Sequence, residues 1–148
     1  MSEPDSAGNE QDQAEEGQAQ SDPRFYLLRN AAAAGDYQAA GQMIDQDPTI
    51  VAAKNSIGET ALHFLVVEND LEAVEFLAEH GSEVNSRNAF GQSALYEAAQ
   101  LGSVEMIDLL LRLGARPGMA EGAEIVQAAK RGKRKQIAAV LQPHSVAV

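Results

Sequence analysis

In the middle of the chain, apolar residues recur every three or four positions, which predicts a pair of short amphipathic helices. The first is expected to begin after Thr60, a residue type that favours the N-cap, and to end near Val67. Asn69 and Asp70 then favour a tight turn. A second helix is expected over 71–80. Its apolar stripe consists of Leu71, Val74, Leu77 and Ala78.

The same pattern returns 33 residues later. Six identities share this one spacing, and they are Gly58/Gly91, Ala61/Ala94, Leu62/Leu95, Glu72/Glu105, Leu77/Leu110 and Gly81/Gly114. Weaker copies flank the pair, and the downstream one has lost part of its leading turn. Such helices are shorter than the roughly 12–15 residues that give marginal stability alone. We therefore expect the copies to stack into a solenoid.

A unit of this length that opens with "GETALH" (58–63) and closes with "HGSEVN" (80–85) resembles the ankyrin repeat. The resemblance covers about residues 25–142. It implies an all-α ankyrin-repeat solenoid of stacked helix–turn–helix units with β-turn-like loops. The chain departs from the family pattern at four positions, with Ala61 and Ala94 in place of proline, Tyr96 in place of histidine and Asn69 in place of glycine.

The ends of the chain differ in composition from its centre. Residues 1–22 carry seven acidic side chains, no basic one and, after Met1, no large apolar one, so we expect a disordered acidic tail. An ankyrin-repeat domain is expected over 23–142, followed by a C-terminal tail over 143–148. The expected repeats are at about 25–54, 55–87, 88–118 and 119–142, the outer two serving as polar caps.

Composition excludes several classes of function. The 148 residues contain no cysteine, which excludes disulfides and thiolate-bound metals. A formal net charge of −11 disfavours nucleic-acid binding, because phosphate groups would be repelled. The N-terminus lacks the pattern of a signal peptide, and no apolar run approaches the roughly 20 residues that span a bilayer. We expect a monomeric, cytoplasmic protein without membrane contact, or a nuclear one if the source is a eukaryote.

The basic cluster "KRGKRK" (130–135) has three interpretations. The favoured one is a solvated turn and helix start on the last repeat. The second is a nuclear localisation signal. The third is electrostatic contact with the acidic tail or with an acidic partner.

His63 is the residue most open to a catalytic interpretation, since a hydroxyl lies close by at Thr60. A catalytic or metal site would need a nucleophile, a base or further ligands near it, and no His-x-x-x-His or Gly-x-Ser-x-Gly spacing occurs. The sequence favours a structural role, with His63 hydrogen-bonded to the Thr60 hydroxyl at the helix start. No catalytic residue, cofactor or metal ion is expected. The residues assigned structural roles are Thr60, His63, Ser93, Tyr96, Gly81 and Gly114.

Ankyrin-like proteins typically bind other proteins through turn tips and first-helix surfaces, so the resemblance implies a non-catalytic adaptor, scaffold or inhibitor. The family's variable positions give a partner-binding set of Lys54, Ser56, Ile57, Glu59, Val67, Glu68, Arg87, Ala89, Phe90, Gln92, Gln100 and Leu101. Ile57 and Phe90 stand at successive tips and predict a small apolar hot spot facing a groove. The alternative is that both side chains pack on neighbouring turns.

Two other functions stay open from the sequence alone. One is an accessory subunit that stabilises or regulates a partner enzyme. The other is a nuclear or transcription-linked regulator, for which the basic cluster is the only support.

Overall fold

The computed structural model describes residues 20–129 and 132–145, so most of the predicted acidic tail and part of the basic cluster lie outside it. The described part is all-helical, as expected. Its elements are α2 (Pro23–Ala33), α3 (Tyr37–Gln46), the 3₁₀ helix η1 (Pro48–Ala52), α4 (Ala61–Val67), α5 (Leu71–Glu79), α6 (Ala94–Leu101), α7 (Val104–Arg112), α8 (Gly118–Ala128) and α9 (Arg134–Ser145). None of these helices combines the length and apolar character needed to cross a membrane.

The first helix of each central repeat begins at a hydroxyl side chain. Thr60 Oγ1 accepts a hydrogen bond from the backbone N–H of His63 at 3.3 Å. One repeat later, Ser93 Oγ accepts from the backbone N–H of Tyr96 at 3.2 Å. These bonds satisfy N–H groups that the first turn leaves without a helical partner, which is important for helices of only two turns.

The turn between the two helices of a repeat requires a left-handed residue. Asn69 adopts a φ of 60° there, and Gly102, at the equivalent position of the next repeat, a φ of 79°. The Ser103 hydroxyl donates to Asn69 Oδ1 at 2.8 Å and so joins the two turns. Asparagine replaces the family's glycine at this position because it tolerates the left-handed conformation.

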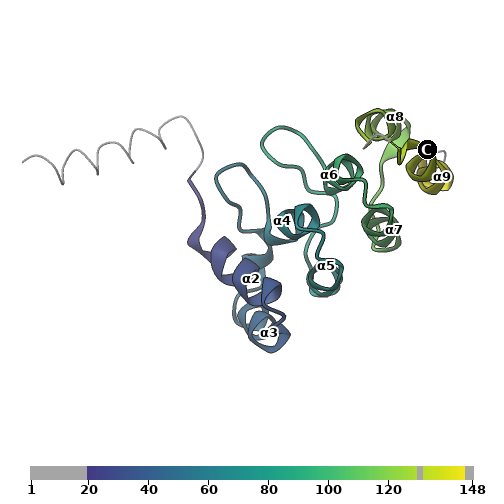
Figure 1. The fold of residues 1–148 in the computed structure, drawn as a ribbon. Helices are drawn as coiled ribbons and strands as arrows, with labels where there is room; N and C mark the ends of the chain where they lie inside the picture. The colour runs from purple at the N-terminus through teal and green to yellow at the C-terminus, as the bar shows by residue number, and fades with distance from the viewer. Residues whose placement is uncertain (1–19, 130–131, 146–148) are drawn as a thin grey trace, which may run out of the picture.

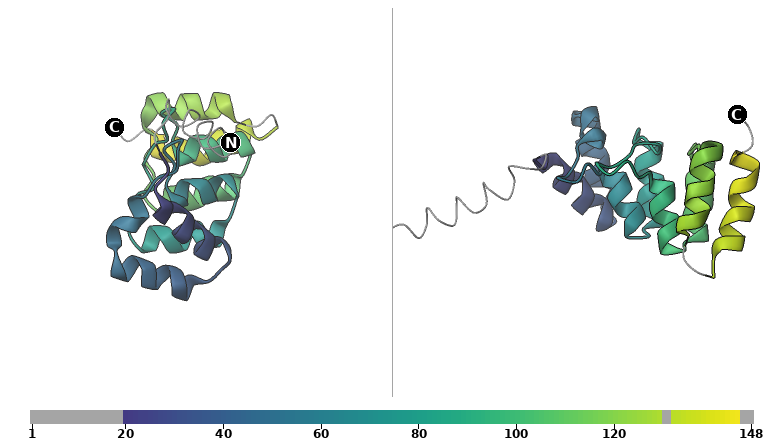
Figure 2. Two further views of the ribbon diagram at one scale, coloured as in Figure 1. Left: turned by 90° about the vertical axis from the view of Figure 1, so that its left-hand side faces the viewer. Right: turned by 90° about the horizontal axis from the view of Figure 1, so that it is seen from above.

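The helix pairs stack in one direction and form two rows (Figures 1 and 2). Helices α2, α4, α6 and α8 contact one another in sequence, while α5, α7 and α9 do so in the second row. Leucines from both rows are fully buried between them, including the equivalent pairs Leu62/Leu95 and Leu77/Leu110. The 33-residue period therefore reproduces one packing unit, and the core is continuous along the stack.

The last repeat differs from the central ones at both ends. Only residues 113–117 separate α7 from α8, which confirms that its leading turn is shortened. Helix α9 continues to Ser145, so the predicted boundary at residue 142 is wrong. Helix α9 packs against both α7 and α8.

Candidate functional site: the tip face

Residues 54–60 and 87–93 form two hairpin-like loops, which project from the row of first helices (Figure 1). Each loop is closed by an antiparallel bridge, Lys54 to Thr60 in one and Arg87 to Ser93 in the other. We call these two loops, together with the exposed sides of α4, α6 and α8, the tip face.

An asparagine shapes each hairpin from inside. Asn55 Oδ1 accepts from the backbone N–H of Ile57 at 3.1 Å and of Glu59 at 2.9 Å. Asn88 makes the same pair of bonds, at 2.9 and 3.0 Å, one repeat later. The hairpins are also joined to each other, since the N–H of Ala89 donates to the Ile57 carbonyl at 2.8 Å. The tips are thus ordered before any partner arrives, which lowers the entropic cost of binding.

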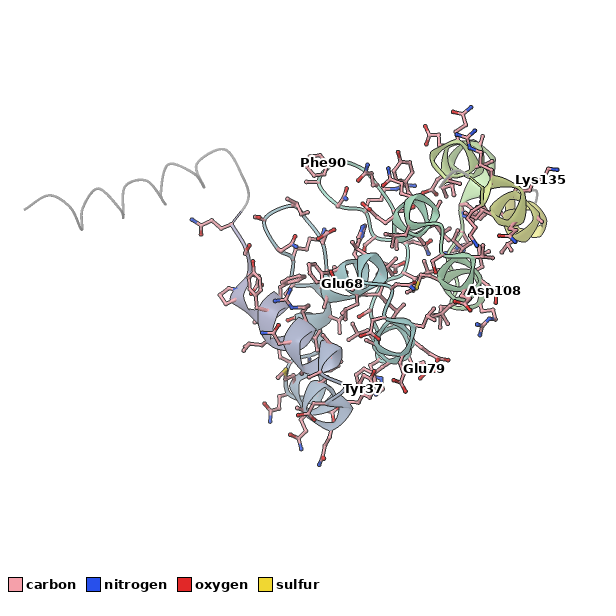
Figure 3. The ribbon with its side chains drawn as sticks, in the orientation of Figure 1. Tyr37, Glu68, Glu79, Phe90, Asp108 and Lys135 are labelled. Carbon is pink, nitrogen blue, oxygen red and sulfur yellow. The ribbon has the colours of Figure 1, made fainter. Side chains whose placement is uncertain are left out.

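Two apolar side chains stand at the ends of these ordered loops. Phe90 is 70% exposed, and Figure 3 shows it at the far end of its hairpin, away from the helices. Ile57 is 38% exposed at the equivalent position, and Leu101 is 40% exposed at the end of α6. We call Ile57 and Phe90 the rim pair. The exposure of Phe90 rules out its packing into neighbouring turns, so this side chain contributes little to the core.

The other predicted partner-binding residues divide by exposure. The exposed ones are Lys54, Glu68, Arg87, Ala89 and Gln100, and the half-buried ones are Ser56, Val67 and Gln92. Glu59 is only 6% exposed, so its side chain is buried rather than presented to a partner. The side-chain amide of Asn55 donates to Glu59 Oε1 at 3.0 Å and holds the carboxylate inside the hairpin.

A hollow of about 570 Å³ lies beside the third-repeat hairpin. Its walls include Phe90 and Tyr96 on one side and Glu121, Glu124 and Gln127 of α8 on the other. Because the last repeat has no hairpin of its own, nothing covers this flank in the described part of the chain. Arg87 also lines the hollow and forms an ion pair with Glu121 at 3.1 Å, so the tip face combines an apolar edge with a polar, charged recess.

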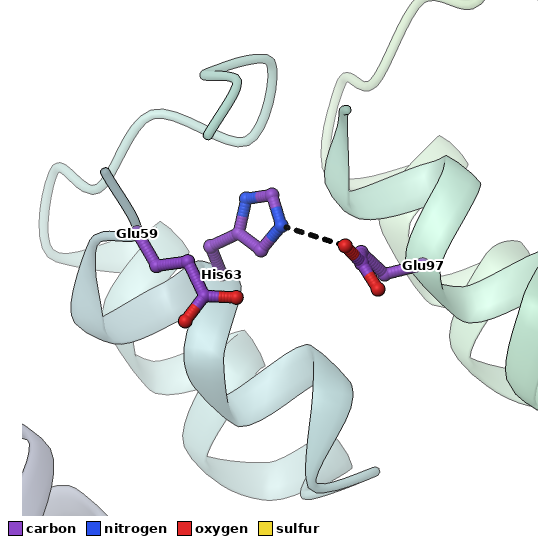
Figure 4. A group of neighbouring side chains, drawn as sticks. All are labelled: Glu59, His63 and Glu97. Atoms are coloured by element: carbon purple, nitrogen blue, oxygen red, sulfur yellow. Dashed lines mark ion pairs between the residues drawn. The ribbon is translucent and has the colours of Figure 1, made fainter. Parts of the chain in front are cut away.

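A second feature lies beneath the hairpins, where Glu59 and His63 of the second repeat meet Glu97 of α6 (Figure 4). His63 is 1% exposed, and its Nε2 lies 3.9 Å from Glu97 Oε2. Burial lowers the pKa of His63 to about 4, so the imidazole is neutral at pH 7 and the contact is not an ion pair there. Burial and the nearby charge of Glu59 both raise the pKa of Glu97.

The role predicted for the His63 ring is wrong in its detail. Its two nitrogens are buried and make no hydrogen bond to the described residues, whereas the Thr60 hydroxyl accepts from the His63 backbone. The ring points instead across the gap between repeats toward Glu97 (Figure 4). The sequence could not show this contact, because the two residues lie 34 positions apart.

The described part of the basic cluster is solvent-facing. Lys133, Arg134 and Lys135 are exposed where α9 begins. The Arg134 guanidinium donates to the Gln127 carbonyl of α8 at 2.8 Å, so one of the three also ties the last two helices together. This arrangement supports the solvated-turn interpretation for these three residues, while Lys130 and Arg131 lie outside the described part.

Comparison with known families agrees with the repeat architecture. Residues 28–121 match the family model described as ankyrin repeats in three copies. The chain belongs to the ankyrin-repeat family. Ankyrin repeats generally mediate protein–protein interaction, and the repeat domain itself is typically non-catalytic.

The similar proteins differ widely in what their names describe. The chain is 36% identical over 85 residues to the E3 ubiquitin-protein ligase XBAT33 of Arabidopsis thaliana. The aligned segment covers 57% of this chain and 17% of the relative. It is 40% identical over 57 residues to a probable 26S proteasome regulatory subunit, p28, of Saccharomyces cerevisiae, covering 38% of this chain and 25% of the relative. The chain thus spans under a fifth of the first relatives' length.

Sequence reasoning overlooked several residues that shape the tip face. Asn55 and Asn88 are a further identity at the 33-residue spacing, and this signal would have found them. Glu97, Glu121 and Glu124 gave no such signal, because only the stacking of successive first helices brings them to the hairpins.

Proposed function

We propose that this chain is a non-catalytic protein-binding module whose partner covers the rim pair and the hollow beside it. The observation that carries the proposal is the 70% exposure of Phe90 on a hairpin that Asn88 and the neighbouring loop hold in place. A large apolar side chain has little reason to be fixed in solvent, and aromatic anchors of this kind dominate binding energies in interfaces. Glu124, which also lines the hollow, favours a partner segment that places a basic side chain next to an apolar one, whereas Glu121 is already paired with Arg87 at 3.1 Å.

The test is affinity capture from native lysate with the wild type and the double variant Ile57→Ser, Phe90→Ala. We expect the variant to lose its partner, because hot-spot truncations cost about 2 kcal/mol or more each in binding. Helical content and Tm should change little, since both side chains are substantially exposed. A large fall in Tm would contradict the assignment and show that the rim pair belongs to the core.

Leu27→Ala provides the matched control for this experiment. Leu27 is 56% exposed on α2, so its truncation removes a comparable apolar side chain outside the two hairpins. Partner capture should survive this change. Equal loss of capture in both variants would point to non-specific adhesion through any exposed apolar residue.

Two broader assignments stay proposals. An accessory subunit of a partner enzyme is favoured by the similarity to a protein named as a proteasome regulatory subunit. It differs from a plain adaptor in that the captured partner would be an enzyme whose activity changes on binding. A cytoplasmic location, and a nuclear role that depends on the basic cluster, remain predictions from the sequence.

A further inference from the structure

The group formed by Glu59, His63 and Glu97 has features that a solely structural role does not explain. One ligand-type atom from each of the three side chains lies within 4.8 Å of the other two. His63 is 1% exposed, and both ring nitrogens lack a hydrogen-bond partner among the described residues. Buried polar atoms are nearly always paired, so a nitrogen that faces a carboxylate without bonding to it indicates a missing ligand.

The two carboxylates are oriented but not neutralised. Glu59 accepts from the Asn55 amide at 3.0 Å, and Glu97 Oε2 lies 3.4 Å from the corresponding amide of Asn88. Among the residues that the structure describes, neither carboxylate forms an ion pair with a lysine or arginine. Two carboxylates, one buried and one half-buried, beside an imidazole without a hydrogen-bond partner among those residues form an environment that would favour a bound cation.

We propose that Glu59, His63 and Glu97 form a binding site for a divalent transition-metal ion, with Zn²⁺ the best fit to one imidazole nitrogen and two carboxylates. Zn²⁺ binds such ligands at about 2.0–2.2 Å, with ligand atoms about 3.5 Å apart, so modest side-chain rotations would close the present spacing. Both ring nitrogens of His63 lack a hydrogen-bond partner among the described residues, so one is free to coordinate, and Glu97, at 17% exposure, leaves a side open for water as a fourth ligand.

The position of the site explains what a bound ion would do. Glu59 and His63 come from the second repeat and Glu97 from the third, so the ion would join two repeats. Its carboxylates are held by Asn55 and Asn88, the asparagines that shape the two hairpins. Tyr96 replaces histidine one repeat later, so the third repeat cannot supply an equivalent imidazole at that position. Metal binding would therefore stabilise this one junction and the hairpins above it.

The experiment uses the full chain, stripped of metal with a chelator and titrated with ZnCl₂ by calorimetry, with Tm measured in parallel. We expect one Zn²⁺ per chain, a higher Tm with the metal, and a visible absorption band on substitution with Co²⁺. His63→Gln and Glu97→Gln should each weaken Zn²⁺ binding more than about tenfold and remove the rise in Tm.

Two variants serve as matched controls. His80→Gln removes the exposed histidine that ends α5, and Glu75→Gln an exposed carboxylate of the same helix. Both should bind Zn²⁺ as the wild type does. Absence of saturable binding, or affinity unchanged by His63→Gln, would overturn the proposal. If His63→Gln does not fold, Zn²⁺ binding by Glu97→Gln, a change at a partly exposed residue, tests the proposal. Zn²⁺ binding is measured on the isolated chain, so its result does not depend on the result of partner capture.

Discussion

Gly58→Ala is expected to destabilise the fold by about 2 kcal/mol, twice the cost of the same change at the equivalent Gly91. Both glycines adopt left-handed backbone conformations, with φ of 80° and 78°. An added methyl group in this region costs about 1 kcal/mol at either position. The two positions differ in what surrounds that methyl group.

A Cβ at Gly58 would lie 2.7 Å from the backbone nitrogen of Ala89, in the next hairpin, whereas a Cβ at Gly91 meets nothing within 4 Å. The obstructing atom is backbone and cannot rotate away, so the hairpins must separate. Separation stretches the hydrogen bond from Ala89 to the Ile57 carbonyl, whose loss would add about 1 kcal/mol to the strain.

Urea unfolding of the wild type, Gly58→Ala and Gly91→Ala measures this difference in the free energy of unfolding. Thermal unfolding should give a Tm about 4 °C lower for Gly58→Ala than for Gly91→Ala. The second variant carries the same backbone strain and so isolates the contact between hairpins. Similar losses in the two variants would show that conformational strain alone acts and that the hairpins are not closely packed.

Acidification should destabilise the metal-free wild type by about 2 kcal/mol more than His63→Gln between pH 7 and pH 4.5. Burial lowers the pKa of His63 to about 4 in the folded chain, from its ordinary value of 6.5. Between these two values the unfolded state binds a proton that the folded state does not. The contribution of neutral His63 to the free energy of unfolding is therefore fully present above about pH 6.5 and is lost as the pH falls toward 4.

The groups facing His63 are Glu59, from the second-repeat hairpin, and Glu97, from α6. The raised pKa of Glu97 acts in the opposite direction, because its protonation on acidification favours the folded state. Both carboxylates are retained in His63→Gln, so the difference between wild type and variant isolates the histidine.

The measurement is the free energy of unfolding in urea at pH 7, 5.5 and 4.5, with chelator present. His80→Gln, which removes an exposed histidine, should follow the wild-type pH profile. Parallel profiles for wild type and His63→Gln would mean that the buried imidazole takes up a proton without cost, as it would if Glu97 paired with it.

The helices and their ends could be read from the sequence because they depend on neighbouring residues. Thr60 and Ser93 cap the helices that follow them, and Asn69 makes the expected turn. The 33-residue period gave the stacking, since every copy has the same apolar stripe to bury. The predicted boundary at residue 142 is wrong because α9 continues to Ser145, a helix end that the repeat pattern does not specify.

The repeat is encoded locally: the residues show where each helix begins, which face is apolar, and which side chains stand at the tips. The burial of Glu59, the contact of His63 with Glu97 and the hollow beside Phe90 became visible only in the folded chain. The physical reason is that local hydrogen bonds and apolar spacing operate within one repeat. The contact of His63 with Glu97 and the shape of the recess are set instead between repeats, by side chains that come from successive repeats.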